Sequence, residues 1–137
     1  MNVFVAFAVD MQSRPLMSLR GGNDLDQCRS ISAFDSAMDT ISDTYLEQNC
    51  WGLGYLDAGS WRHYLPYLME YTVRHLEQGS EVVDALLNNL RPPDREPPRL
   101  ESLTDHQQAA LRRFLELLGF SDKSAHAELA CQVIEEW

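Results

Sequence analysis

From Asn23 onward, apolar side chains recur every three or four residues, and this spacing constrains the fold more than any other feature of the chain. Steps of three or four place successive side chains on one face of an α-helix. The first series predicts a helix from about Asn23 or Asp24 to about Gln48, with a buried face formed by Ile31, Phe34, Met38, Ile41 and Tyr45. No convincing alternating strand pattern occurs beyond residue 10. The sequence therefore predicts an all-α protein.

Capping residues and glycines set the limits of the next two helices. Ser60 is a suitable N-cap for a second helix, and Gly79 is a suitable residue to end it. Pro66 lies six residues after Ser60, so this helix either kinks there or restarts with the proline in its first turn. Ser80 then predicts the start of a third, short helix.

Four prolines between residues 91 and 99 exclude a helix and predict a stiff, extended loop. Thr104, followed three residues later by Gln107, predicts a capping box at the start of a fourth helix, which Gly119 ends. A fifth helix is expected to begin at residue 121 or 122. We therefore predict a single compact domain of about five helices.

The N-terminal segment does not share the helical period. Val3 to Val9 is an apolar run that Asp10 ends, and we interpret it as a short strand or an extended arm. This divides the chain into an N-terminal arm, residues 1–22, packed on a helical domain, residues 23–137. The run is too short for a membrane helix, and no basic residue precedes it as in a signal peptide.

Cysteine usage points to a reducing compartment. Cys28, Cys50 and Cys131 are odd in number and far apart, and none lies in a C-x-x-C or C-x-x-H pair. We therefore expect free thiols and a cytoplasmic protein.

The charge balance limits the classes of partner. Of the 137 residues, 21 are Asp or Glu and 11 are Lys or Arg, which gives a net charge of −10. Such a surface repels nucleic acid and anionic membranes, whose binding depends on basic side chains. It favours a basic protein partner, because complementary fields accelerate association. We therefore expect a protein partner and neither nucleic acid nor membrane.

The middle of the chain resembles a family of small, uncharacterised bacterial helical proteins. The likeness rests on Cys50–Leu53 and on Ser60–Leu68, which contains an aromatic-Tyr-Leu-Pro segment at the start of a long helix. The break at Arg91–Pro93 and the segment Leu103–Leu111 are similar to the later part of that family. The resemblance covers roughly residues 50–118. Similar small acidic proteins occur beside secreted bacterial toxins as their immunity proteins, which implies that role for this chain.

Four carboxylates recur at steps of four within the first predicted helix. On a helix, Asp35, Asp39, Asp43 and Glu47 would form one row about 18 Å long. Like charges at this spacing destabilise a helix, and no Lys or Arg lies between residues 29 and 62 to relieve them. The row is either a solvated face or a surface that recognises a partner. We predict that it contacts a partner.

Two tyrosines extend this candidate surface, and a metal site is its alternative. Tyr67 and Tyr71 are candidates for partner contact, because aromatic side chains are favoured at interfaces. Carboxylates at helical spacing also bind Mg²⁺ in all-α nucleotide hydrolases, but the other predicted helices offer no matching pair. No histidine lies in a catalytic motif. We therefore predict no catalytic residues, no metal and no cofactor.

These observations predict a protein that acts by binding another protein. The most concrete form is an immunity protein, or antitoxin, that covers the active site of a secreted toxin domain. The alternatives are a small all-α metal-dependent nucleotide hydrolase and a structural subunit or adaptor.

Overall fold

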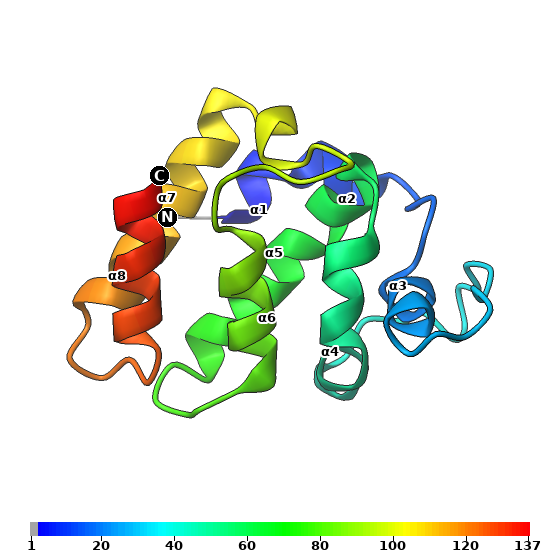
Figure 1. Cartoon of the computed structure of the whole chain (residues 1–137), viewed down its shortest axis with the longest axis horizontal. Helices are drawn as coiled ribbons and strands as arrows, with labels where there is room; N and C mark the ends of the chain where they lie inside the picture. The colour runs from blue at the N-terminus through cyan, green and yellow to red at the C-terminus, as the bar shows by residue number, and fades with distance from the viewer. Residues whose placement is uncertain (1–2) are drawn as a thin grey trace.

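In the computed structural model, which describes residues 3–137, these residues form an all-helical, single compact domain (Figure 1). The α-helices are α1 (Val3–Ala6), α2 (Ala8–Gln12), α3 (Leu19–Asp26), α4 (Asp43–Asn49), α5 (Ala58–Arg74), α6 (Glu81–Asn89), α7 (Asp105–Phe120) and α8 (Ala127–Glu136). Two 3-10 helices, η1 (Cys50–Tyr55) and η2 (Leu100–Ser102), complete the described part. The predicted all-α class is confirmed. The predicted number of about five helices is wrong, because short helices replace segments expected to be extended or continuous.

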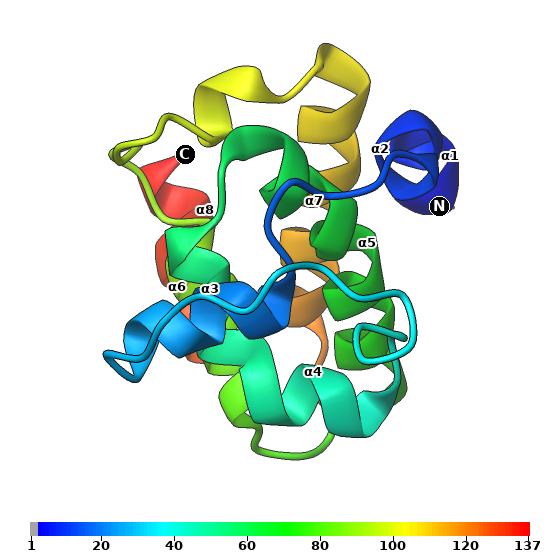
Figure 2. The same ribbon diagram turned by 90° about the vertical axis from the view of Figure 1, so that its right-hand side faces the viewer.

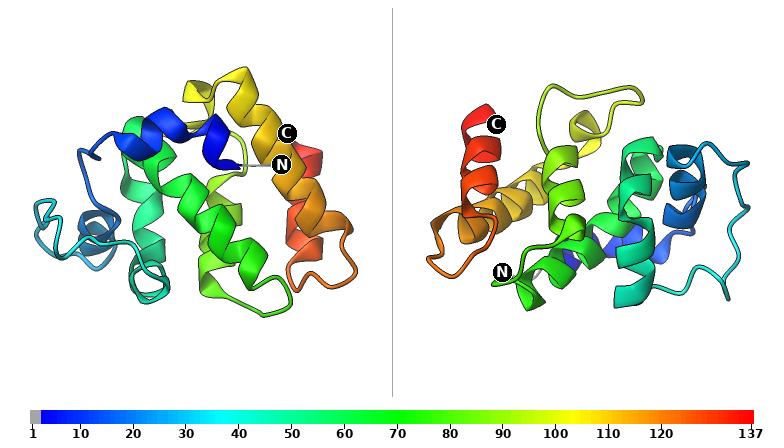
Figure 3. Two further views of the ribbon diagram at one scale, coloured as in Figure 1. Left: turned by 180° about the vertical axis from the view of Figure 1, so that it is seen from behind. Right: turned by 60° about the horizontal axis from the view of Figure 1, so that its bottom comes forward.

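The core forms around α5, which crosses the middle of the molecule. Its large apolar side chains Trp61, Leu65, Leu68 and Met69 are fully buried. The α5 helix begins at Ala58, about two turns before the proline, so a restart there is wrong and Pro66 lies inside the helix. Helices α7 and α8 lie side by side at the end of the molecule opposite α3 (Figure 3).

Predictions based on local capping succeed at two helices. Ser80 caps α6, because its side chain accepts a hydrogen bond from the backbone N–H of Val82. Thr104 and Gln107 form the predicted capping box at the start of α7, with 3.1 Å for each of the two hydrogen bonds. The segment from Arg91 to Arg99 forms no helix, as the prolines predict. Short-range hydrogen bonds determine the two caps, and the prolines, which lack a backbone N–H, determine the third feature.

Four other helix limits differ from the prediction. Helix α5 ends at Arg74, five residues before Gly79. Asp57, not Ser60, caps α5, because the Asp57 carboxylate accepts from the Ser60 backbone N–H and hydroxyl. Gly119 lies within α7, which continues to Phe120. The last helix begins at Ala127 instead of residue 121 or 122.

The predicted helix from residue 23 to residue 48 is wrong. Helix α3 ends at Asp26, Cys28 has a positive φ of 58°, and α4 begins only at Asp43. Between them, short polar side chains bind nearby backbone N–H groups in place of helical carbonyls. Asp35 accepts from the N–H groups of residues 37 and 38 in this way. Figure 2 shows the resulting loop leading from α3 to the start of α4.

Two glycines allow α3 to lie directly against η1. A Cβ atom on Gly22 would lie 2.3 Å from the carbonyl oxygen of Gly52, and one on Gly52 would lie 2.3 Å from the carbonyl oxygen of Leu19. Real Cβ atoms do not approach other atoms so closely, so neither position accepts a larger side chain at this separation. The backbones of α3 and η1 therefore touch at these glycines.

The N-terminal segment is helical, which corrects the expectation of a strand or extended arm. Phe7, between α1 and α2, is fully buried. Asp10 of α2 accepts hydrogen bonds from Arg62 Nε at 3.1 Å and from Gln107 Nε2 at 2.7 Å, which ties this segment to α5 and α7. The predicted boundary between residues 22 and 23 lies inside α3. Within the described chain, no helix has both the length and the apolar character needed to span a membrane.

Candidate interaction surface

The four carboxylates of the predicted row occupy two different environments. Asp35 and Asp39 lie in the loop between α3 and α4, whereas Asp43 and Glu47 lie one turn apart on α4. The row is absent because the continuous helix that it required is absent. The position of each carboxylate therefore has to be considered separately.

Asp39 is a buried ion-pair partner. It is 5% exposed and accepts hydrogen bonds from Arg20 Nε and Nη2, both at 3.1 Å, from Tyr45 Oη at 2.7 Å and from the Asp35 N–H at 2.8 Å. Burial by itself raises the pKa of Asp39. The hydrogen bonds, chiefly those from Arg20, outweigh burial and hold this pKa below its usual value. Asp39 therefore joins the loop to α3 and α4.

Asp43 is paired with the end of α5. Its two carboxylate oxygens accept from Arg74 Nη1 at 2.9 Å and Arg74 Nη2 at 2.6 Å, and His75 Nε2 lies 3.3 Å from Oδ2. The hydrogen bonds from Arg74, followed by the one from His75, lower the pKa of Asp43 from 3.8 to about 2. Arg74 also pairs with Glu70 one turn earlier on α5. One guanidinium thus holds two carboxylates.

Glu47 and Tyr71 form a second link between α4 and α5. Tyr71 Oη donates to Glu47 Oε2 at 2.7 Å, and Tyr71 is 4% exposed. Burial, followed by the hydrogen bond to Glu47, raises the pKa of this tyrosine. Tyr67 lies one turn earlier on α5 and is half-buried beside the ring of His63. The structure therefore brings Asp43, Glu47 and Tyr71 together, with Tyr67 nearby.

These residues belong to one acidic edge of the molecule. We use the term acidic edge for five carboxylates on α4, the end of α5, the following loop and the start of α6: Asp43, Glu47, Glu70, Glu77 and Glu81. Figure 1 shows the start of α4 and the α5–α6 loop along its lower edge. Glu47, Glu77 and Glu81 are exposed, and Arg74 is the basic residue that pairs with members of this group among the described residues.

Sequence reasoning missed Arg74, Glu77 and Glu81 as parts of this surface. The spacing of Glu70 and Arg74 signals an i, i+4 pair. No sequence signal shows that Arg74 also reaches Asp43, which is 31 residues away. Glu77 and Glu81 lie shortly after the end of α5, so they could have been assigned to the acidic edge once the end of that helix was known.

Metal-ligating groups and cysteines are the chemical features to consider beside this surface. Among residues 3–137, no group of three or more His, Cys, Asp or Glu side chains could hold a metal ion. All three cysteines are free, with Cys28 exposed and Cys50 buried. Burial, followed by the charge of Glu81, raises the pKa of the Cys50 thiol to about 11, so it is protonated at neutral pH and a poor nucleophile.

Comparisons with known proteins give one match that bears on identity. A search of curated proteins and a search of solved structures each found no match. A family model, described as a family of unknown function (DUF6714), matches residues 6–137, from the end of α1 to the last residue. Because this match covers nearly the whole chain, the protein belongs to the DUF6714 family of unknown function.

Proposed function

We propose that this protein binds a basic protein partner through its acidic edge and acts as an immunity protein that covers the active site of a secreted toxin domain. The observation that carries the proposal is the distribution of charge. Of the 11 basic residues, six arginines already form ion pairs, namely Arg20, Arg29, Arg62, Arg74, Arg91 and Arg112. Most of the basic side chains are thus paired with carboxylates of the protein itself, and the excess negative charge remains on exposed carboxylates.

An acidic surface of this kind suits rapid recognition of a basic cleft. Toxins that act on nucleotides or RNA need positive charge to bind their substrates, so an acidic protein can occupy the same cleft. The same charge repels cellular nucleic acid, which adds specificity. At the acidic edge, Glu77 and Glu81 are exposed and available for such contacts.

The metal-dependent hydrolase lacks a comparable supporting observation. The carboxylates that it would use are already committed: Asp39 to Arg20, Asp43 to Arg74 and Glu47 to Tyr71. A divalent cation needs about six oxygen ligands and would have to displace these partners. We therefore do not advance the hydrolase as a second function.

The first test co-expresses this protein with the protein encoded beside its gene and measures cell growth. The second measures the association rate of the purified pair as a function of ionic strength. We expect protection from toxicity and association that slows as salt rises. The double variant Glu77→Gln/Glu81→Gln should associate several-fold more slowly at low salt.

The matched control is Glu101→Gln/Asp105→Asn, at η2 and the start of α7. Both control residues are exposed, and Asp105 occupies the first turn of its helix as Glu81 does. Figure 1 places these residues' helices at the opposite edge of the molecule. A neighbouring protein that is harmless and does not bind contradicts the immunity role. Equal slowing by both double variants contradicts docking through the acidic edge.

A further inference from the structure

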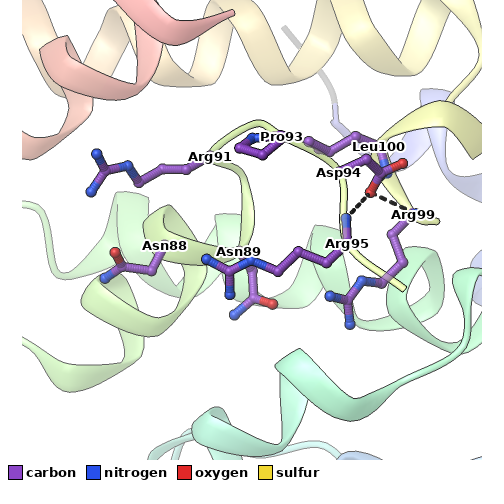
Figure 4. Close-up of a pocket in the computed structure, with 8 residues that line it drawn as sticks. All are labelled: Asn88, Asn89, Arg91, Pro93, Asp94, Arg95, Arg99 and Leu100. Carbon is purple, nitrogen blue, oxygen red and sulfur yellow. Dashed lines mark hydrogen bonds between the residues drawn. The ribbon is translucent and has the colours of Figure 1, made fainter. Parts of the chain in front are cut away.

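A polar pocket lies beneath the proline-containing loop that joins α6 to η2. Its lining includes Asn88 and Asn89 from the end of α6 and Arg91, Arg95 and Arg99 from the loop (Figure 4). Only about 10 Å³ of this pocket admits the centre of a water molecule, within about 220 Å³ of space not filled by atoms that includes open solvent, so a larger ligand would lie at its solvent-open mouth. Three arginines in one pocket are unexpected in a chain of net charge −10.

Asp94 shapes this loop, and its charge raises the pKa of Arg99 against the larger effect of burial, but it forms no ion pair with any of these arginines. Its Oδ1 accepts from the backbone N–H groups of Arg95, Arg99 and Leu100 at 2.9–3.0 Å, and its Oδ2 accepts from that of Glu101 at 2.9 Å. Burial by itself raises the pKa of Asp94, but these four hydrogen bonds outweigh it and lower the pKa. The carboxylate is therefore satisfied by backbone groups, and it forms no ion pair within residues 3–137.

Arg99 is a buried cation without a carboxylate partner in the described chain. It is 5% exposed, and its Nη1 donates to the carbonyl oxygens of Leu53, Gly54 and Leu56 at 3.4, 2.8 and 3.3 Å. These contacts cap the end of η1 and explain the position of Nη1. None of the hydrogen bonds found among residues 3–137 uses Nε or Nη2. One edge of the guanidinium is thus uncommitted, although a buried charge is costly unless it is paired.

Arg95 places a second positive charge beside the first. Its side chain is exposed, forms no ion pair within the described residues and extends along the pocket toward Asn89 (Figure 4). After burial, which is the largest cause, the nearby charge of Arg95 also lowers the pKa of Arg99. Arg91 is different, because its guanidinium binds Glu136 at 2.6 and 3.0 Å. The pocket therefore holds two cations, Arg95 and Arg99, that form no ion pair within the described residues.

We propose that this pocket binds a phosphate group, held by the uncommitted edge of Arg99 and by the guanidinium of Arg95. Planar guanidinium groups bind phosphate oxygens in pairs, and an anion would compensate the buried charge of Arg99. Each asparagine donates one amide hydrogen to α6 and retains a second that none of the hydrogen bonds found among the described residues uses. The phosphate group can belong to inorganic phosphate or to a phosphate monoester whose remaining part lies in solvent.

The test is titration calorimetry at pH 7 with inorganic phosphate and with glycerol 3-phosphate, each against sodium chloride at equal ionic strength. We expect saturable binding of at least one phosphate compound and none of chloride. Saturation by both compounds supports a monoester as ligand, and saturation by inorganic phosphate alone supports the free ion. Absence of saturable binding by both overturns the proposal.

Two arginine variants locate the binding. Arg95→Gln should weaken phosphate binding about tenfold, as expected for the loss of one charge-assisted contact. The matched control, Arg113→Gln on α7, removes the same charge from an exposed arginine that makes no ion pair in the described chain, and it should leave affinity unchanged. Equal weakening in both variants would show a general charge effect and overturn the site.

Arg99→Lys separates the fork of the guanidinium from its charge. A lysine keeps the positive charge and can still donate to the carbonyl oxygens of η1, but it cannot bind two phosphate oxygens side by side. We expect weaker phosphate binding by a folded protein. Wild-type affinity in a folded Arg99→Lys protein contradicts the proposed geometry. Should this variant not fold, the comparison of Arg95→Gln with Arg113→Gln still decides the proposal.

Discussion

Asp39 connects its loop to two helices through a single buried carboxylate. Its carboxylate accepts four hydrogen bonds that come from α3, from its own loop and from α4. Its side chain is fully inaccessible to solvent, whereas that of Arg20 is 23% exposed. Asp35, four residues earlier, is exposed and holds only a local turn. Two acids that look equivalent in the sequence therefore contribute differently to stability.

Asp39→Ala should lower the free energy of unfolding by about 2–4 kcal/mol, because it leaves Arg20 and Tyr45 without their shared acceptor. The control, Asp35→Ala, removes an exposed acid and should cost about 1 kcal/mol or less. Urea denaturation of both variants measures the difference. Equal losses would show that Asp39 is no more important than a solvated acid.

The lowered pKa of Asp43 predicts how the stability of the protein changes at acidic pH. Its folded-state pKa is lowered from 3.8 to about 2, chiefly by hydrogen bonds from Arg74. Its contribution to stability is therefore present above the unfolded value and is lost as the pH falls from about 4 to about 2. The melting temperature of the wild type should fall more steeply across this interval than that of Asp43→Asn. Parallel curves would contradict a stabilising link between Asp43 and Arg74.

At the scale of elements, the contact between α3 and η1 depends on glycine for space. Gly22→Ala should destabilise the protein by about 1–3 kcal/mol, because its Cβ would overlap the backbone of η1 and force the two elements apart. Gly54→Ala is the control, since its Cβ would meet only the side chain of Asn89 at 3.7 Å. Thermal unfolding of both variants tests this. A neutral Gly22→Ala would mean that α3 can move away without cost.

At the scale of the whole molecule, a net charge of −10 makes the folded state repel itself. Added sodium chloride screens this repulsion. It also weakens exposed ion pairs such as Arg112–Glu116, but this costs little stability because such pairs contribute little to begin with. The melting temperature should therefore rise between low salt and about 0.15 M, where the screening length is about 8 Å. A melting temperature that falls with salt would show that internal ion pairs outweigh the repulsion.

Features that depend on neighbours within a few residues could be predicted from the sequence. The helical period predicts the all-α class, Ser80 and the Thr104–Gln107 box mark the starts of α6 and α7, and the prolines exclude a helix from residue 91 to residue 99. Caps and turns satisfy backbone groups over two to four residues, so their partners can be identified from the sequence alone.

The organisation of the first third of the chain and of the candidate site depends on contacts between residues far apart in the sequence. The apolar period from residue 31 to residue 45 is typical of a helix, yet Ile31 and Met38 remain exposed in a loop. That loop is tied down by the pair of Arg20 and Asp39, 19 residues apart, and α4 is tied to α5 by Asp43 and Arg74, 31 residues apart. Partners so distant in the sequence are brought together only by the packing of the elements between them. For this reason, local spacing predicted one row of carboxylates, whereas the folded chain has two separate groups.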